Sequence, residues 1–253
     1  MNKTTIEYCD YSWNPLTGCT KRCSYCYANR LAQGWLRNIY SANPAVAPGC
    51  DPSDPFSPRY WYSRLSQPGT VKRPSKIFTV DMGDLFDPAV PQAWIYAVLD
   101  HVLRFYWHTF IFLTKQPQRA AAFTFPPNAW AGVTVNNAYQ ESAITALRLK
   151  EVNATVRFFS IEPLLGSIPI LPAWVNWVIV GAMTGSAKTV LEHAEQYPGA
   201  QPMKHNGKWT LQPHPDWVNT LLDEAARHGI KVFLKDNLDW SLRRTEWPRG
   251  IKP

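Results

Sequence analysis

Three cysteines lie within eight positions near the start of the chain, and their type and spacing could bind a metal centre. Cys19, Cys23 and Cys26 follow the pattern C-x3-C-x2-C. Thiolates are ligands of iron-sulfur clusters and of zinc, and one loop could wrap all three around a single centre. Lys21 and Arg22 would offset the negative charge of a thiolate-bound cluster. Three ligands would leave one iron of a [4Fe-4S] cluster free to bind a cofactor or a substrate.

A structural zinc site is the main alternative, with Cys9 or Cys50 as the fourth ligand. Such sites normally have four protein ligands in two separated pairs, and this clump of three differs from that layout. Three unligated thiols would be a redox liability, so we expect a metal. The odd total of five cysteines also differs from the even framework of a small secreted domain.

Polar residues follow the ends of several predicted strands. Runs of β-branched and aromatic residues predict strands at residues 76–80, 109–113, 129–135, 155–161, 175–180 and 231–234, with a further short strand just before Cys19. At or just beyond their carboxyl ends lie Asp81, Asp84, Thr114, Lys115, Asn136, Glu162 and Lys235. One such residue is usually a helix cap or a loop residue. Their recurrence after successive strands indicates a site.

Helical spacing of apolar residues predicts helices at residues 91–107, 139–151 and 215–228. Alternating strands and helices form parallel sheets that are covered by helices. Six or seven such units favour an α/β fold, namely a full or partial (β/α) TIM-like barrel with mainly parallel strands. An open doubly wound sheet remains the alternative. In a barrel, the carboxyl ends of the strands form the active site, which is where the polar residues lie.

A chain of 253 residues, 45% of them hydrophobic, is typical of one α/β barrel domain, so we expect a single domain over residues 1–253. Two long stretches, residues 41–75 and 184–214, interrupt the alternation of predicted strands and helices. The first holds seven prolines, too many for a helix or a central strand, and we expect an ordered excursion or a lid. The second carries three histidines and three lysines, and we expect a lid or a disordered loop.

The balance of charge favours an anionic partner. The chain carries 26 Lys and Arg against 19 Asp and Glu, a formal charge of +7. Arg243 and Arg244, beside Trp240 and Trp247, could contact phosphates and stack on bases, although tryptophans also pack cores and arginines also cover solvated surfaces. Nucleic acid is therefore favoured over a peptide or a small molecule. No apolar segment is long enough to span a bilayer, and we expect a cytoplasmic protein without membrane contact.

With Tyr25 directly before the third cysteine, the cysteine motif resembles the signature of the radical S-adenosylmethionine (SAM) superfamily. The resemblance implies that Cys19, Cys23 and Cys26 bind three irons of a [4Fe-4S] cluster, and that the fourth iron chelates the amino and carboxylate groups of SAM. Reduction by an external electron donor would then cleave SAM to methionine and a 5'-deoxyadenosyl radical. The resemblance also implies that Tyr25 lies near the adenine.

Nearly end to end, the chain resembles an uncharacterised phage and bacterial family with a three-cysteine motif, which is regarded as radical SAM-like. The matching segments are residues 11–21, 81–86, 113–117, 132–136, 160–166 and 233–235. The chain departs from this family at residues 181–185, where Gly-Ala-Met-Thr-Gly replaces Gly-Gly-Glu-Ser-Gly and removes an acidic group. The first two cysteines are also closer together than in the family, and Cys9 stands where the family has Thr, so Cys9 is not expected to be a ligand.

These observations predict a radical SAM enzyme whose substrate is shielded inside a barrel, with nucleic acid modification or repair as the favoured reaction class. We expect Glu162, Lys115, Asp81 and Asp84 to be catalytic, and the cofactor to be bound by Tyr25, Thr114, Asn136, Gly181, Gly185 and Lys235. A non-enzymatic nucleic-acid-binding module with zinc or a structural cluster is the second hypothesis. A redox sensor is the third, although a sensor needs no rim of polar residues at strand ends.

Overall fold

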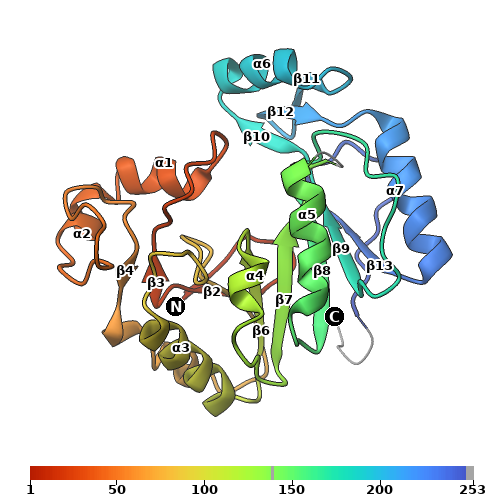
Figure 1. The fold of residues 1–253 in the computed structure, drawn as a ribbon. Helices are drawn as coiled ribbons and strands as arrows, with labels where there is room; N and C mark the ends of the chain where they lie inside the picture. Colours follow the sequence, from red (N-terminus) through yellow and green to blue (C-terminus); the bar gives the residue numbers. More distant parts are fainter. Residues whose placement is uncertain (138–139, 249–253) are drawn as a thin grey trace. The chain divides into compact units, whose positions relative to one another are not determined.

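The computed structural model of the chain describes residues 1–137 and 140–248 (Figure 1). They divide into two compact units, which comprise residues 1–132 with 151–155 and residues 133–150 with 156–253. Strand β7 (Ala129–Thr134) begins in the first unit and ends in the second. No helix among the described residues is long and apolar enough to cross a membrane.

The first unit is built on strands β1 (Asn2–Lys3), β2 (Tyr11–Trp13), β5 (Lys76–Thr79) and β6 (Thr109–Thr114), followed in the sheet by β7. Strand β1 is antiparallel to β2, whereas β2, β5 and β6 are parallel to one another. Most side chains of β5 and β6 are buried on both faces, and their sequences are accordingly almost continuous runs of aromatic and β-branched residues.

Two helices accompany these strands. Helix α3 (Gln92–Arg104) connects β5 to β6 and buries Ile95, Val98, Leu99 and Val102, whose spacing of three and four residues forms one apolar stripe. Helix α4 (Pro117–Ala120) follows β6 and begins with a proline, which is favourable at a first helical position because its missing N–H needs no partner there.

The proline-rich excursion of the first unit is ordered. It begins at the end of helix α2 (Arg37–Ser41), which follows helix α1 (Tyr27–Gln33). Strand β4 (Arg59–Tyr60), within the excursion, pairs antiparallel with β3 (Leu16–Thr17), and two 3₁₀ turns follow, η1 (Tyr62–Arg64) and η2 (Gln67–Thr70). Phe56 and Arg59 are fully buried, so the excursion packs back on its own unit.

In the second unit, β7 is followed in the sheet by β8 (Val156–Ile161), β9 (Trp177–Val180) and β13 (Lys231–Leu234). Strand β9 is parallel to both neighbours and is fully buried. Helix α5 (Gln140–Arg148) with the turn η3 (Leu149–Glu151) precedes β8, and helix α7 (Pro215–His228) precedes β13. Helix α7 ends at Gly229, whose φ of 65° is the left-handed conformation that commonly terminates a helix.

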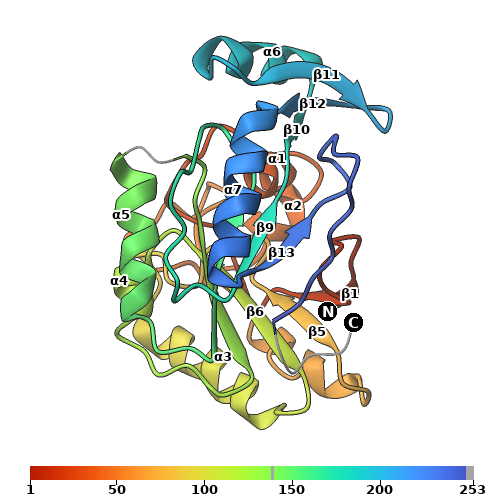
Figure 2. The ribbon, with the colours of Figure 1, turned by 90° about the vertical axis from the view of Figure 1, so that its right-hand side faces the viewer.

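Residues 183–212 of the second unit form a small antiparallel sheet with one helix, beyond the end of β9 (Figure 2). Its strands are β10 (Met183–Gly185), β11 (Gln201–His205) and β12 (Lys208–Gln212), and its helix is α6 (Ala187–Gln196). The turn between β11 and β12 is Asn206-Gly207, both with positive φ, which is the preferred two-residue hairpin turn. This stretch is therefore ordered rather than a disordered loop.

All six predicted strands are present, with ends that differ by two residues at most, and the three predicted helices are present as α3, α5 and α7. The prediction of an α/β fold with a mainly parallel sheet is confirmed. Among the described residues, the sheet order ends at β1 and β13 and does not close into a ring of hydrogen bonds. The full barrel and the single domain remain predictions.

Candidate functional site

The loop that carries the three cysteines starts with a close approach of two backbones. Gly18 donates its N–H to the Met82 carbonyl at 2.8 Å, and its own carbonyl accepts from Asp84 N at 3.3 Å. A Cβ on Gly83 would lie 2.4 Å from the Gly18 oxygen, and a Cβ on Gly18 would lie 2.4 Å from the Ser57 oxygen. Only glycine fits at both positions, so the cysteine loop is fixed to the segment that follows β5.

The thiols of Cys19, Cys23 and Cys26 are partly exposed and free of disulfides. Cys19 Sγ accepts from the Lys21 N–H at 3.3 Å, and Cys26 Sγ caps helix α1 by accepting from the Asn29 N–H at 3.4 Å. Burial, followed by nearby carboxylates, raises the pKa of Cys19, and burial is also the main cause of the raised pKa of Cys26. Without a metal, both groups are therefore thiols.

A three-thiolate cluster fits this loop in donor type and in chain connectivity. The donors are three thiols on one segment of eight residues, all accessible to solvent in part. Among the described residues, no three His, Cys, Asp or Glu side chains are already arranged as a metal-binding group. Cys9, the possible fourth zinc ligand, is buried and donates its thiol to the Ile6 carbonyl.

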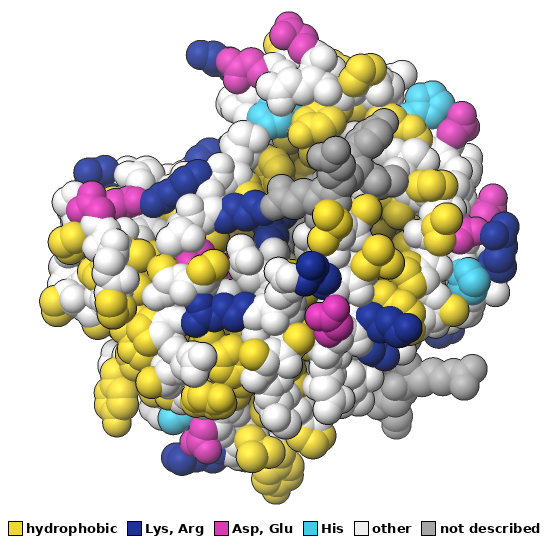
Figure 3. Space-filling view, viewed as in Figure 1, with side chains coloured by type: hydrophobic (Ala, Val, Ile, Leu, Met, Phe, Trp, Pro, Cys, Tyr) yellow, Lys and Arg dark blue, Asp and Glu magenta, His cyan; other side chains and the backbone are white. Residues whose placement is uncertain are grey.

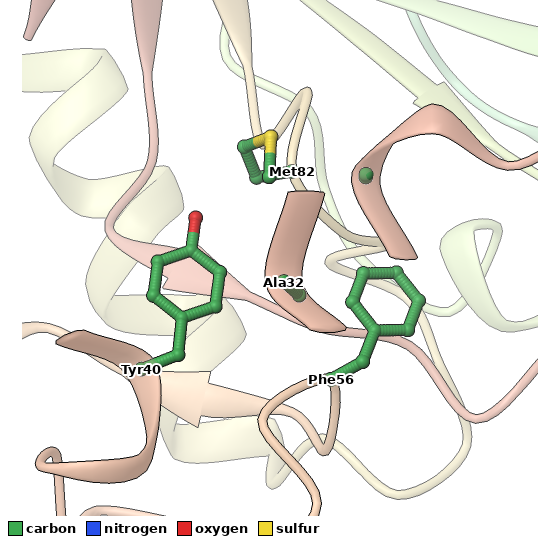
Figure 4. Packing of buried hydrophobic residues seen from close by; sticks show 5 residues of the cluster. Ala32, Tyr40, Phe56 and Met82 are labelled. Atoms are coloured by element: carbon green, nitrogen blue, oxygen red, sulfur yellow. The ribbon is translucent and has the colours of Figure 1, made fainter. Parts of the chain in front are cut away.

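Apolar packing holds the helices that follow the loop. Ala28 and Ala32 of α1 pack with Tyr40 of α2, and Phe56 and Met82 complete the buried cluster (Figure 4). Partly buried Cys19 and Cys26 lie against the same cluster. The cysteine loop therefore rests on a formed core rather than on solvent.

Asp84 is buried and anchors the end of β6. Its carboxylate accepts from Thr114 Oγ1 at 2.7 and 3.0 Å, from Lys115 N at 3.0 Å and from Phe86 N at 3.0 Å. Burial raises the pKa of Asp84, and these hydrogen bonds oppose that rise. The buried Asp84 carboxylate therefore holds Thr114 and Lys115 in place at the end of β6, and its catalytic role remains a prediction.

Lys115 brings the end of β6 to the cysteine loop. Its Nζ lies 3.1 Å from Tyr25 Oη, and the ammonium lies 5.6 Å from the centre of the Tyr25 ring. The positive charge of Lys115 also lowers the pKa of Cys26, against the larger effect of burial. A cation and a phenol thus lie together immediately beside the third cysteine.

Asp81 lies at the same edge, after β5, on a strained backbone. Val80, directly before it, has a φ of 63°, which is rare for a β-branched residue and is typical of functional sites when it occurs. The Asp81 carboxylate accepts from Asn14 Nδ2, and Tyr27 Oη donates to the Asp81 carbonyl at 2.7 Å. Burial raises the pKa of Asp81.

Asp87 is a residue that the sequence did not single out. Its Oδ2 accepts from Thr20 N at 2.7 Å and from Thr20 Oγ1 at 2.8 Å, directly after the first cysteine. The sequence feature that could have pointed to Asp87 is its position three residues after Asp84, because both carboxylates follow the same strand. Asn14 and Tyr27, which hold Asp81, were also missed.

A second group of predicted residues lies at the ends of β8, β9 and β13 in the second unit. Lys235 Nζ pairs with Glu162 Oε2 at 3.3 Å, and Glu162 Oε1 is buried without a hydrogen-bond partner among the described residues. A Cβ on Gly181 would lie 3.2 Å from Lys235 Cδ and 3.4 Å from Glu162 Cγ, so glycine leaves room for the pair. Asn237, another residue that the sequence did not single out, braces this corner by bonding both to Ala182 N and to Ala182 O.

Asn136 and Gly185, both predicted to bind the cofactor, have different surroundings. Asn136 is buried and donates its Nδ2 to the Pro163 carbonyl at 2.7 Å, beside Glu162 in the chain. Gly185 lies in β10, where an added Cβ would make ordinary contacts of 3.4 to 3.5 Å with Thr189 and Val190. The contacts of Gly185 are therefore with helix α6 rather than with the Glu162–Lys235 pair.

The predicted site residues thus form one group in each unit. The first unit gathers Cys19, Cys23, Cys26, Tyr25, Asp81, Asp84, Thr114 and Lys115, and the second gathers Asn136, Glu162, Gly181 and Lys235. In the first unit, the loop with the three thiols lies beside the Lys115 ammonium, the Tyr25 phenol and the carboxylates of Asp81 and Asp84. In the second, a buried carboxylate oxygen is available for a hydrogen-bond donor.

The sequence matches the model of one family, described as "Protein of unknown function (DUF5131)", over residues 3–196. No curated protein matches the chain. Solved structures of spore photoproduct lyase are similar in fold. A cysteine-to-alanine variant is 10% identical with a TM-score of 0.53, and a complex with dinucleoside spore photoproduct is 10% identical with a TM-score of 0.52, each over 92% of this chain and 79% of that chain. A variant with bound AdoMet, which is SAM, and dinucleoside spore photoproduct is 11% identical with a TM-score of 0.51, over 91% and 78%.

Proposed function

The chain belongs to the DUF5131 family, whose members are described as proteins of unknown function, and we propose that this protein is a radical SAM enzyme. The observation that carries the proposal is the loop of three free, partly exposed thiols, with Tyr25 and Lys115 in contact beside the third one. A fold similar to that of a lyase with bound AdoMet supports it. When bound, a [4Fe-4S] cluster on Cys19, Cys23 and Cys26 and SAM would supply reductive cleavage of SAM to methionine and a 5'-deoxyadenosyl radical.

The residues of the first unit have distinct parts in this proposal. Asp84 fixes the backbone and hydroxyl at the end of β6, so that Lys115 reaches Tyr25. Lys115 then supplies a positive charge beside the cysteine loop, where it would attract the carboxylate of SAM and offset the charge of thiolates. Tyr25 presents an aromatic face on which an adenine could stack. Asp81, held by Asn14, offers a carboxylate to a polar group of the ligand.

In the second unit, the Glu162–Lys235 pair is suited to hold polar atoms of a bound molecule. The buried Oε1 of Glu162 lacks a donor among the described residues, and a ligand hydroxyl or amine would satisfy it. Lys235 Nζ places a positive charge 3.3 Å from the other oxygen, Oε2. We assign this pair to SAM or substrate binding.

For the substrate we propose a nucleic acid that is modified or repaired. The formal charge of +7 favours a polyanion, and three of the structures with a similar fold hold a dinucleoside photoproduct. The electron that starts the reaction would come from an external donor. A zinc-bearing, non-enzymatic module is the competing hypothesis, and it predicts that SAM does not bind.

The test begins with anaerobic reconstitution of the full chain with iron and sulfide. We expect absorption near ~400 nm from a thiolate-bound cluster, and 5'-deoxyadenosine after reduction in the presence of SAM. Cys23→Ala should abolish both, whereas Cys50→Ala should leave the iron content unchanged. Tight zinc binding without a cluster, or deoxyadenosine that persists in Cys23→Ala, would exclude the proposed reaction.

A further inference from the structure

The segment that contains the cysteines has an unusual distribution of charge. Residues 11–50 hold no Asp or Glu, but they hold four cationic residues, Lys21, Arg22, Arg30 and Arg37. All three cysteines lie inside this stretch, as do helices α1 and α2. The chain therefore surrounds its thiols, along the sequence, with positive charge alone.

Helices α1 and α2 expose cations and large apolar side chains together. Trp35, between the two helices, is 73% exposed and Ile39 is 50% exposed, and Arg30 and Arg37 are exposed as well. The buried side of the same helices is accounted for by the cluster around Ala32. In Figure 3, dark-blue and yellow side chains adjoin over the α1 and α2 segment at the left, with an acidic group among them.

Among the described residues, Arg30 and Arg37 are not neutralised by a carboxylate. Asp54 is salt-bridged to Arg22 and accepts from Gln33 Nε2 at 2.8 Å, so this carboxylate beside α1 is already paired. Arg37 donates to the neutral Gln33 Oε1 at 3.1 Å, and the Arg30 side chain makes no ion pair among the described residues. Arg30 and Arg37 thus present net positive charge around exposed Trp35.

We propose that this α1–α2 face, defined by Arg30, Trp35 and Arg37, docks an acidic one-electron carrier protein that reduces the cluster. The inference rests on the proposed function. In the transfer, one electron leaves the reduced carrier and enters the oxidised cluster, and no covalent bond forms or breaks. Cys26 is the N-cap of α1, whose seven residues span about 10 Å at 1.5 Å per residue. A carrier seated on this face would therefore lie close to the thiol ligands.

The anatomy of the face favours a protein over a nucleic acid. The face exposes a tryptophan together with arginines, and Trp and Arg are both enriched in protein interfaces. Redox encounters are small and weak, and opposite charges steer them. Two arginines would neutralise few phosphates, so this face is small for a nucleic acid.

The experiment uses the reconstituted full chain with reduced flavodoxin, an acidic flavin carrier, as the probe. Stopped-flow absorption follows reduction of the cluster by flavodoxin and, separately, by dithionite. We expect Arg30→Glu/Arg37→Glu to slow reduction by flavodoxin at least about tenfold at low salt, and high salt to remove most of the difference. Reduction by dithionite should be unchanged. Trp35→Ser should slow the flavodoxin reaction without this dependence on salt.

The matched control is Arg73→Glu/Arg104→Glu, which makes the same change of charge at exposed residues that precede the starts of β5 and β6. It should react with flavodoxin like the natural chain. The docking proposal would be overturned if flavodoxin reduced the cluster of Arg30→Glu/Arg37→Glu as fast as that of the control. It would also be overturned if Arg30→Glu/Arg37→Glu lost binding to a single-stranded DNA 20-mer while its reduction by flavodoxin was unchanged. Absence of a cluster, or of deoxyadenosine with dithionite, would instead overturn the proposed function.

Discussion

The carboxylate of Asp87 holds Thr20, the residue after the first cysteine, through both its backbone N–H and its hydroxyl, at 2.7 and 2.8 Å. Asp84, three residues earlier, anchors the end of β6. One short segment after β5 therefore fixes two parts of the candidate site at once, the cysteine loop and the strand end that carries Lys115.

Asp87→Asn should weaken retention of the cluster. A hydrogen bond to a charged group contributes about 1.5–3 kcal/mol, and the amide would retain only part of that. We expect iron to be lost to a chelator at least about fivefold faster than from the natural chain, since ~1 kcal/mol corresponds to a factor of this size. Asp100→Asn, on the exposed face of α3, is the control and should match the natural chain. Equal loss rates for the two variants would show that Asp87 does not secure the loop.

Gly83→Ala should destabilise the first unit by about 1–3 kcal/mol, the usual cost of forcing extra atoms into a packed site. The added Cβ would lie 2.4 Å from the Gly18 oxygen, and one of the two backbones would have to move. Urea denaturation of the metal-free chain measures the effect. Gly185→Ala is the control, because its Cβ meets only ordinary contacts, and it should change stability by less than about 1 kcal/mol. A Gly83 variant as stable as this control would contradict the close approach.

Tyr25→Phe and Lys115→Met should each slow cleavage of SAM without removing the cluster, because neither residue is a ligand in our proposal. Their contact of 3.1 Å predicts that the effects are not additive. We expect the double variant to resemble the worse single variant, with iron content unchanged. The rate of deoxyadenosine formation and the iron per chain are the measurements. Fully additive losses would mean that the two side chains act independently.

Glu162→Gln should reduce affinity while leaving the fold intact. The Gln amide has nearly the same shape as the carboxylate, and its oxygen can still accept from Lys235 Nζ, so the local packing should be kept. Loss of the buried carboxylate should weaken binding of SAM or of the substrate about tenfold, as expected for one charged hydrogen bond. Calorimetric titration with SAM, together with a melting curve, separates the two effects. A large fall in melting temperature with unchanged affinity would assign the pair to structure.

The stability of the first unit should depend on His108 between neutral and mildly acidic pH. The ring is buried with Nε2 at 3.1 Å from the Pro68 carbonyl, and burial lowers the pKa of His108. As pH falls below about 6.5, the unfolded chain binds a proton that the folded chain does not, so stability is lost until pH passes the folded pKa. We expect His108→Gln to flatten this part of the curve of unfolding free energy against pH. If the slope of unfolding free energy against pH is the same in His108→Gln as in the natural chain, His108 is not the cause of this pH dependence.

The sequence by itself determined most of the strands and helices, and it predicted a metal centre at the cysteine loop. Strands such as Trp177–Val180 are continuous apolar runs, and α7 carries a clear apolar stripe, so local patterns were sufficient to predict them. Residues 184–214 were less clear, because β11 is polar and mostly exposed and gains its structure from pairing with β12. The spacing of the cysteines indicated a metal without any knowledge of the fold.

Only the tertiary structure decided which side chains meet. The contacts of Thr20 with Asp87 and of Tyr25 with Lys115 join residues that are 67 and 90 positions apart, and no local pattern encodes such pairings. The bracing of Ala182 by Asn237 and the approach of Gly83 to Gly18 are likewise set by where strands end in space. Within each unit, parallel strands bring their carboxyl ends to one edge irrespective of their separation in sequence, and for that physical reason each group of site residues follows from the sheet.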